Sequence, residues 1–213
     1  MHIQINALVP ELEAATRIAA AGFVQPLSET LRADVAQHLM EGCLVQSFTN
    51  EEEVVLGFAI YRLFEFVPDT RLLYLAGIIL DPAIQGQHLA ERSIRQAAKE
   101  LRATHLGLRT QSLRMWVVGD RLTKSAWEPN LVDWAEQFHV QTHFPKPELM
   151  SLGQKLAEVL GCSSFPYLPG FYGAPLYGTK PTYKHRTLQT WWDTWCEFER
   201  GDAVLCVGSL RDL

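Results

Sequence analysis

The hydrophobic pattern is clearest between residues 72 and 101, where a continuous apolar run precedes a polar turn and an amphipathic segment. Residues 72–80 are almost wholly apolar, as in a strand buried on both faces, and Asp81-Pro82 ends the run because proline cannot donate a hydrogen bond to a neighbouring strand. Beyond the turn, apolar residues recur at helical spacing with charged residues on the opposite side: Ala90, Ile94, Ala97, Ala98 and Leu101. The pattern predicts a strand, a turn and a helix that packs on the sheet.

The same kinds of hydrophobic pattern predict strands and helices in the rest of the chain. Strands are predicted at residues 3–8, 43–48, 54–64, 105–111 and 203–208, and helices at residues 10–22, 26–41 and 128–161, with a tail helix around residues 188–195. The short turn before residue 72 predicts an antiparallel hairpin, and a helical crossover makes strand 105–111 parallel to strand 72–80. We therefore predict an α+β (mixed α/β) fold, in which a central mixed sheet carries helices on both faces.

Residues 163–181 combine prolines and glycines with five aromatic residues, namely Phe165, Tyr167, Phe171, Tyr172 and Tyr177. This composition is typical of a stiff, ordered loop. The loop either covers exposed core or forms one wall of a pocket, because long ordered loops are often functional. We predict a single domain over residues 1–213, with an inserted helical and aromatic Pro/Gly-rich segment at about residues 128–182.

Charge and composition restrict the partners. The net charge of −5 and the pI near 5.8 provide no basic field for nucleic acid or an anionic membrane. No apolar span approaches a membrane helix, and the N-terminus lacks a signal sequence, so we expect a cytoplasmic protein. Four cysteines without C-x-x-C spacing are expected to be core residues of a reducing compartment, with no zinc site: Cys43, Cys162, Cys196 and Cys206. His139 and His143, four residues apart, are more simply explained as structural than as metal ligands.

The first turn of the predicted helix after residue 85 carries free backbone N–H groups and the positive end of the helix dipole. The residues before it are small or polar enough for an anion to approach. A pyrophosphate group fits such a position.

This strand, turn and helix resemble the GNAT superfamily of N-acetyltransferases, whose acetyl-CoA loop has the pattern Gln/Arg-x-x-Gly-x-Gly/Ala. Gln85 and Ala90 match the first and last motif positions, and His88 replaces the middle glycine. The predicted order of elements is also similar to the GNAT core. Arg109-Thr110-Gln111 is similar to an Arg-Thr-Gln-Asn-Pro segment of some bacterial GNAT-like proteins, although Ser112 departs from it and is expected to cap the next helix.

The resemblance implies a GNAT-like acyl-CoA N-acyltransferase fold and direct transfer of acetyl from acetyl-CoA, the cosubstrate, to a primary amine, without a metal. The residues that it implies for cofactor binding are Ile78, Ile79 and Leu80, through their main chain on the pantetheine arm, and Gln85, Gly86, Gln87, His88, Leu89 and Ala90 on the pyrophosphate. Ser112, at the start of the next helix, is included with them.

Proton transfer needs a base and an acid. Glu65 is the first candidate base, because Phe64 and Phe66 flank it and an apolar environment raises a carboxyl pKa. The alternative is that Glu65 is a strand-end carboxylate exposed to water. Tyr172 is a candidate acid together with Tyr177 and Tyr183, and the sequence does not choose among them. Ordered water performs these steps in many GNAT members.

The acceptor is expected to be a small-molecule or peptide amine, which the sequence does not identify. A homodimer and a monomer both stay open as oligomeric states. The alternatives are a catalytically degenerate GNAT fold that binds or regulates a partner, and an unrelated α/β fold.

Overall fold

The computed structural model describes residues 2–124, 126–129 and 146–210, and the chain forms two compact units. The first unit comprises Met1–Phe64, Leu73–Ala103 and Tyr177–Thr179, and the second comprises Glu65–Leu72, Thr104–Leu176 and Lys180–Leu213. The fold is α+β, with a mixed sheet flanked by helices, as predicted. No described helix has the length and apolar character that crossing a membrane requires.

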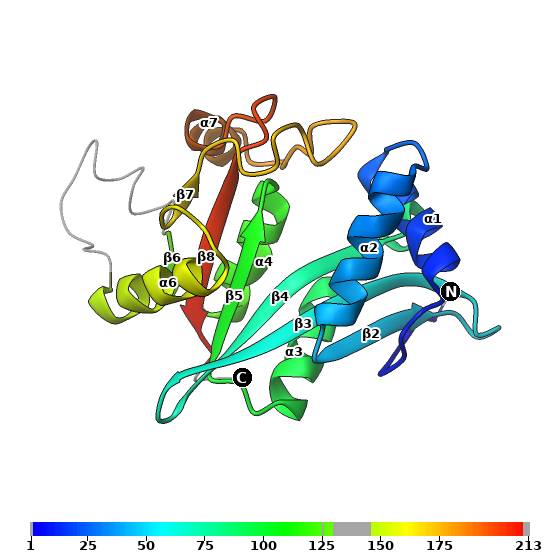
Figure 1. Cartoon of the computed structure of the whole chain (residues 1–213), viewed down its shortest axis with the longest axis horizontal. Helices are drawn as coiled ribbons and strands as arrows, with labels where there is room; N and C mark the ends of the chain where they lie inside the picture. The colour runs from blue at the N-terminus through cyan, green and yellow to red at the C-terminus, as the bar shows by residue number, and fades with distance from the viewer. Residues whose placement is uncertain (1, 125, 130–145, 211–213) are drawn as a thin grey trace. The chain divides into compact units, whose positions relative to one another are not determined.

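The first unit contains the N-terminal elements and the predicted strand–turn–helix (Figure 1). Its elements are β1 (Gln4–Asn6), α1 (Leu12–Phe23), α2 (Glu29–Glu41), β2 (Leu44–Thr49), most of β3 (Val55–Val67) and of β4 (Thr70–Leu80), the 3-10 turn η1 (Pro82–Ile84) and α3 (Leu89–Glu100). The strand order is β1-β2-β3-β4. β1, β2 and β3 pair antiparallel, and only two residues join β3 to β4, so this hairpin is antiparallel as predicted.

Alternating residues of the first unit's strands face different helices. Val45 and Ile60 pack in one apolar cluster with residues of α1 and α2. The next residue on each strand, Gln46 or Tyr61, reaches α3 instead, through hydrogen bonds to Ser93. Because side chains alternate along a strand, helices cover both faces of this sheet (Figure 1).

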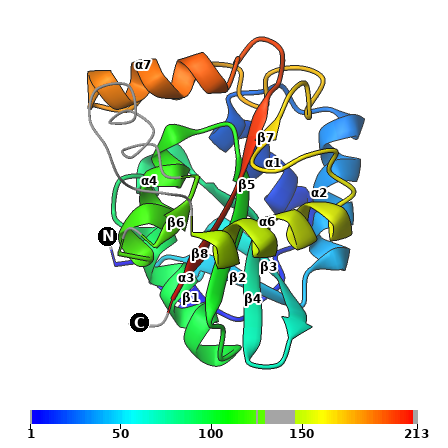
Figure 2. The ribbon, with the colours of Figure 1, turned by 90° about the vertical axis from the view of Figure 1, so that its left-hand side faces the viewer.

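The second unit contains the C-terminal elements. They are β5 (His105–Thr110), α4 (Leu113–Leu122), β6 (Trp127–Glu128), α6 (Pro147–Val159), β7 (Tyr167–Leu168), α7 (Arg186–Trp195) and β8 (Ala203–Ser209). β8 pairs antiparallel with β5, β6 and β7. α6 lies beside β8 in both views, and α7 lies near the end of β5 (Figures 1 and 2). There the indole N–H of Trp192 donates to the carbonyl of Gln111 at 3.2 Å.

Several predicted boundaries and environments were wrong. The helix predicted from residue 26 begins at Glu29, because the Ser28 hydroxyl caps the N–H of Leu31 at 3.1 Å. Glu128 begins no helix but lies in β6, paired with Val207. Cys43 is exposed, because it lies between α2 and β2 rather than inside either, and Cys162 is half-buried. The predictions for His139 and His143 lie outside the described residues.

Candidate functional site

The loop between β4 and α3, residues 81–88, is held by hydrogen bonds to the start of β3 and to the end of β4. The Asp81 N–H donates to the Leu56 carbonyl at 2.8 Å, and the Asp81 carboxylate accepts from the N–H of Ala83 at 2.8 Å. The Gln85 side chain then folds back and donates to the Leu80 carbonyl at 3.0 Å. The side chain of the first motif residue therefore holds the loop, and the loop's main chain is left to face a ligand.

Two residues of this loop have left-handed backbone conformations. Gly86 has a φ of 79° and His88 a φ of 56°. A Cβ placed on Gly86 would meet no atom within 4 Å, so the space beside its main chain is open. Histidine is enriched in the left-handed region relative to most residues, so His88 keeps the backbone conformation that a glycine would otherwise supply.

The N–H groups at the start of α3 are available to a ligand. The first backbone hydrogen bond of the helix runs from the N–H of Arg92 to the His88 carbonyl at 3.1 Å. Across the residues that the structure describes, no protein acceptor takes a hydrogen bond from five preceding N–H groups, those of Gly86, Gln87, His88, Leu89 and Ala90. Such groups, at the positive end of a helix, fit a pyrophosphate.

The side chains of the predicted phosphate residues differ in their placement. Leu89 is 1% exposed and belongs to the core, so only its N–H can face a ligand. Ala90 is half-buried, and the His88 side chain is 69% exposed. The His88 Nδ1 atom lies 3.5 Å from the Glu91 carboxylate.

The end of β4 is packed under α1. Ile79 is buried in the cluster with α1 and α2, and Ile78 and Leu80 are half-buried. A Cβ on Gly22 of α1 would lie 2.6 Å from the Ile79 side chain and 3.2 Å from the Leu80 carbonyl. Only glycine allows this approach. The Ile79 side chain is thus committed to the core, and its predicted cofactor contact is limited to main chain.

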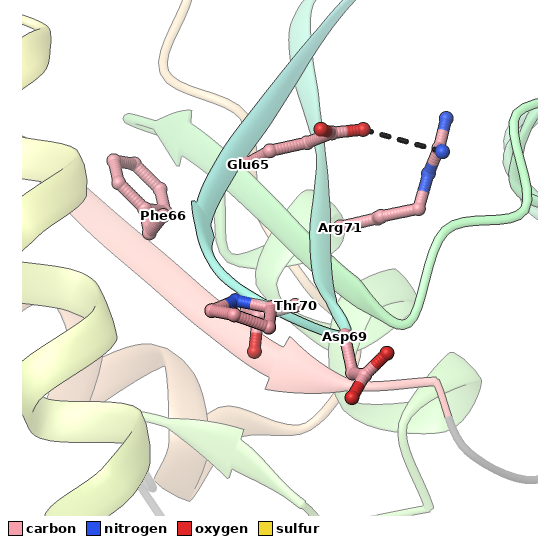
Figure 3. Close-up of a pocket in the computed structure, with 6 residues that line it drawn as sticks. Glu65, Phe66, Asp69, Thr70 and Arg71 are labelled. Carbon is pink, nitrogen blue, oxygen red and sulfur yellow. Dashed lines mark ion pairs between the residues drawn. The ribbon is translucent and has the colours of Figure 1, made fainter.

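Glu65 lies near the β3–β4 turn, beside an open pocket of about 500 Å³ (Figure 3). Its side chain is 62% exposed and points toward Arg71, with 3.2 Å between the carboxylate and the guanidinium. This exposure agrees with the alternative of a strand-end carboxylate in water, because the flanking phenylalanines do not shield Glu65. Arg71 lies near the beginning of β4, whereas the loop of residues 81–88 follows its last residue. A role as base stays a prediction.

Tyr172 lies in an aromatic cluster of the second unit. Its N–H donates to the Gly201 carbonyl at 2.8 Å, and its ring meets Phe171 edge-on at 5.2 Å. The Arg109 guanidinium of β5 stacks 3.9 Å from the Phe171 ring centre and 5.8 Å from that of Tyr172. The other candidate acids lie elsewhere: Tyr177 packs on Phe23 in the first unit, and Tyr183 donates its N–H to Gln189. The choice among the tyrosines stays open.

Ser112 takes the predicted N-cap position of α4, but its hydroxyl makes no capping hydrogen bond. Its N–H instead donates to the Thr110 hydroxyl at 2.9 Å, and the residue is 3% exposed. Its role toward a cofactor stays a prediction. Among the described residues, no group of three metal-ligating side chains comes together.

Sequence reasoning missed the buried polar network around Asp202. This carboxylate accepts hydrogen bonds from Arg200, from the Tyr167 hydroxyl and from the N–H groups of Gly170 and Glu197. Burial alone would raise the pKa of Asp202, but these hydrogen bonds together hold it well below its usual value. The network fastens the aromatic loop to the start of β8. No local feature of the sequence could have revealed it, because Tyr167 and Gly170 lie 35 and 32 residues before Asp202 in the chain.

A second missed network lies under α3. The Tyr61 and Ser93 hydroxyls are 2.5 Å apart, and Ser93 donates to the Gln46 side chain at 2.6 Å. All three are buried, and burial raises the pKa of Tyr61. Its only sequence signal was a serine on the apolar side of the helix.

Comparison with known proteins identifies a family. The sequence model of the Acetyltransferase (GNAT) family matches residues 12–119, about half of the chain. No relative was found among curated proteins.

Three similar solved structures are acetyltransferases. The ribosomal-protein-S18-alanine N-acetyltransferase from Escherichia coli is 18% identical, with 100% of this chain and 96% of that chain covered and a TM-score of 0.48. An aminoglycoside 6'-acetyltransferase type Ii is 10% identical, with 97% of each chain covered and a TM-score of 0.48. A GNAT family acetyltransferase from Brucella melitensis in complex with acetyl-CoA is 19% identical, with 50% of this chain and 75% of that chain covered and a TM-score of 0.39. On the match to the family's sequence model, this chain belongs to the GNAT family and is an acetyltransferase.

Proposed function

We propose that this protein is an N-acetyltransferase that moves an acetyl group from acetyl-CoA to a primary amine by direct attack. The observation that carries the proposal is the loop from Gly86 to Leu89, with two left-handed residues and a row of N–H groups at the start of α3. These features fit a pyrophosphate, the part of CoA that the family's motif binds. Acetyl-CoA supplies a thioester, whose acetyl group is activated toward amines.

The chain's own residues would divide the remaining tasks. The N–H groups of Gly86, Gln87, His88 and Leu89 hold the phosphates, and Gln85 keeps the loop closed through the Leu80 carbonyl. Main-chain N–H groups near the end of β4 stabilise the developing oxyanion. An amine with an unperturbed pKa near ~10 must lose a proton before it attacks. Glu65 or ordered water accepts that proton, and Tyr172 or another tyrosine protonates the leaving thiolate.

The proposal also covers the acceptor, the cellular location and the domain organisation. The acceptor is a small-molecule or peptide amine, and we propose a cytoplasmic location, supported by the two buried free thiols of Cys196 and Cys206. The acidic net charge of −5 favours an amine over nucleic acid as a partner. We also propose that residues 1–213 act as one acetyltransferase domain.

Two measurements test the proposal. Acetyl-CoA at 100 times its dissociation constant is expected to add ~2.7 kcal/mol to the free energy of unfolding and to raise the Tm. A panel of amines, followed by release of the free CoA thiol, is then expected to reveal at least one acceptor. No heat of binding in calorimetry, together with no change in Tm at millimolar acetyl-CoA, would contradict the proposal.

A further inference from the structure

A stripe of positive charge runs along the exposed side of α3. Arg92, Arg95 and Lys99 are spaced by three and four residues, so their side chains lie on one face of the helix. All three are exposed, and within the described chain none of them forms an ion pair. We call these three residues the basic stripe.

The turn between β2 and β3 carries the opposite charge. Glu51, Glu52 and Glu53 are consecutive and exposed, and in the described part of the molecule they also form no ion pair. The Asn50 side chain accepts from the N–H groups of Glu52 and Val54 at 3.0 and 2.9 Å, so the turn has a defined shape. Val54 adds an apolar side chain that is 49% exposed. We call residues 51–54 the acidic tip.

Both patches flank the same edge of the first unit's sheet. Arg92 donates to the Ile3 carbonyl at 3.2 Å, which places one end of the basic stripe beside β1. Gln4 pairs with Thr49, the residue before the acidic turn, which places the acidic tip at the same strand. β1 is the edge strand of the described sheet. A positive and a negative patch therefore border one strand edge without meeting each other.

We propose that this edge binds a second copy of the chain, with the basic stripe of each copy against the acidic tip of the other. In a dimer with twofold symmetry, the basic stripe of each copy contacts the acidic tip of the other copy, so the same contact between opposite charges forms twice. A nucleic acid or an anionic membrane fits less well, since it would meet the three glutamates beside the stripe. The carbonyls of Ile3 and Ile5 already accept hydrogen bonds from Arg92 and Gln96 of α3, so the copies pair by charge rather than by strand addition.

The test is the oligomeric state, measured by analytical ultracentrifugation over a range of protein concentrations. We expect a reversible dimer at ~0.02 M salt, with a dissociation constant that rises at least ~10-fold at ~0.5 M salt because ion pairs are screened. Charge reversal of either patch, by Glu51→Lys with Glu52→Lys or by Arg95→Glu with Lys99→Glu, is expected to leave only monomers. An equimolar mixture of the two reversed variants is expected to form a mixed dimer, because their patches are complementary again.

Matched controls carry the same change of charge in α6 of the second unit or at Lys146, the residue just before it. Glu148→Lys with Glu158→Lys matches the reversed tip, and Lys155→Glu with Lys146→Glu matches the reversed stripe. Both controls are expected to dimerise like the unmodified chain. Circular dichroism verifies that every variant is folded.

Four results would overturn the proposal. The first is an unmodified chain that stays monomeric at low salt and high concentration. The second is a dimer that neither salt nor charge reversal affects, and the third is a mixture of reversed variants that remains monomeric. A monomer that binds poly-glutamate, RNA or anionic vesicles through the stripe would likewise overturn it, because the occupant would then be a different molecule.

Discussion

Replacing Ala90 with Glu is the most direct test of the phosphate loop. Ala90 lies in the first turn of α3 and is half-buried, and among the described residues no protein group accepts a hydrogen bond from its N–H. Ala90→Glu places a carboxylate beside the same N–H groups that a pyrophosphate would use. We expect the apo protein to stay folded and its affinity for CoA to collapse.

The effect of Ala90→Glu on CoA binding is expected to exceed its effect on folding, for a physical reason. A carboxylate in a helix's first turn stabilises it by ~0.3–1 kcal/mol, which offsets the small loss of helix propensity relative to alanine. Two like charges ~5 Å apart repel by ~0.8 kcal/mol in water and by ~3 kcal/mol at an effective dielectric constant of 20. Each phosphate charge near the new carboxylate therefore weakens binding by roughly 4-fold to more than 100-fold.

Isothermal titration of CoA into both proteins measures the loss, and circular dichroism with a thermal melt measures the fold. Gln96→Glu is the matched control, since it introduces the same charge on α3 about 9 Å further along the helix axis, close to one Debye length away. The control is expected to bind CoA within a few-fold of the unmodified protein. An Ala90→Glu protein that binds CoA as tightly as the unmodified chain would place the cofactor elsewhere.

Three further outcomes are expected. His88→Gly should leave CoA binding equal or tighter and change the unfolding free energy by less than ~1 kcal/mol, because relief of left-handed strain offsets added chain entropy; denaturant titration measures this. Glu65→Gln should lower the acetylation rate and flatten its acidic limb, while loss of an exposed ion pair costs under ~1 kcal/mol; an unchanged pH–rate profile removes Glu65 from the mechanism. Because the pKa of Asp202 is lower in the folded protein than the ~3.9 of the unfolded chain, this carboxylate stabilises the fold above pH ~3.9. That stability is lost as the pH falls toward the folded pKa. Asp202→Asn should therefore weaken the dependence of the Tm on acid pH, as melts at several pH values measure.

Much of the first unit could be predicted from local pattern. The apolar run before Asp81 and the spacing of Ile94, Ala97 and Ala98 set the strand and helix correctly, because burial of one face imposes a period that the sequence displays. The motif predicts a phosphate-binding loop for the same reason: in the family, a cradle built from consecutive N–H groups is local in the chain. Local chemistry of this kind is visible in a single sequence.

The sequence did not reveal the environment of a side chain where residues far apart in the chain create it. The neighbours of Glu65 suggested an apolar site, yet the side chain is 62% exposed beside Arg71. Asp202 carries no distinguishing signal in the sequence, and Ser93 only that of a serine on the apolar side of α3, although each is the centre of a buried network.

The sequence by itself determined the order and type of the main elements, the family and the loop that binds the cofactor in that family. Only the tertiary structure decided that His88 keeps a left-handed backbone, that Gly22 lets α1 approach the end of β4, and that Asp202 fastens the aromatic loop. Periodicity and motifs arise from neighbouring residues, which the sequence lists in order. Burial, hydrogen-bond partners and pKa shifts arise from residues that folding brings together from far apart in the chain, and these a single sequence leaves undetermined.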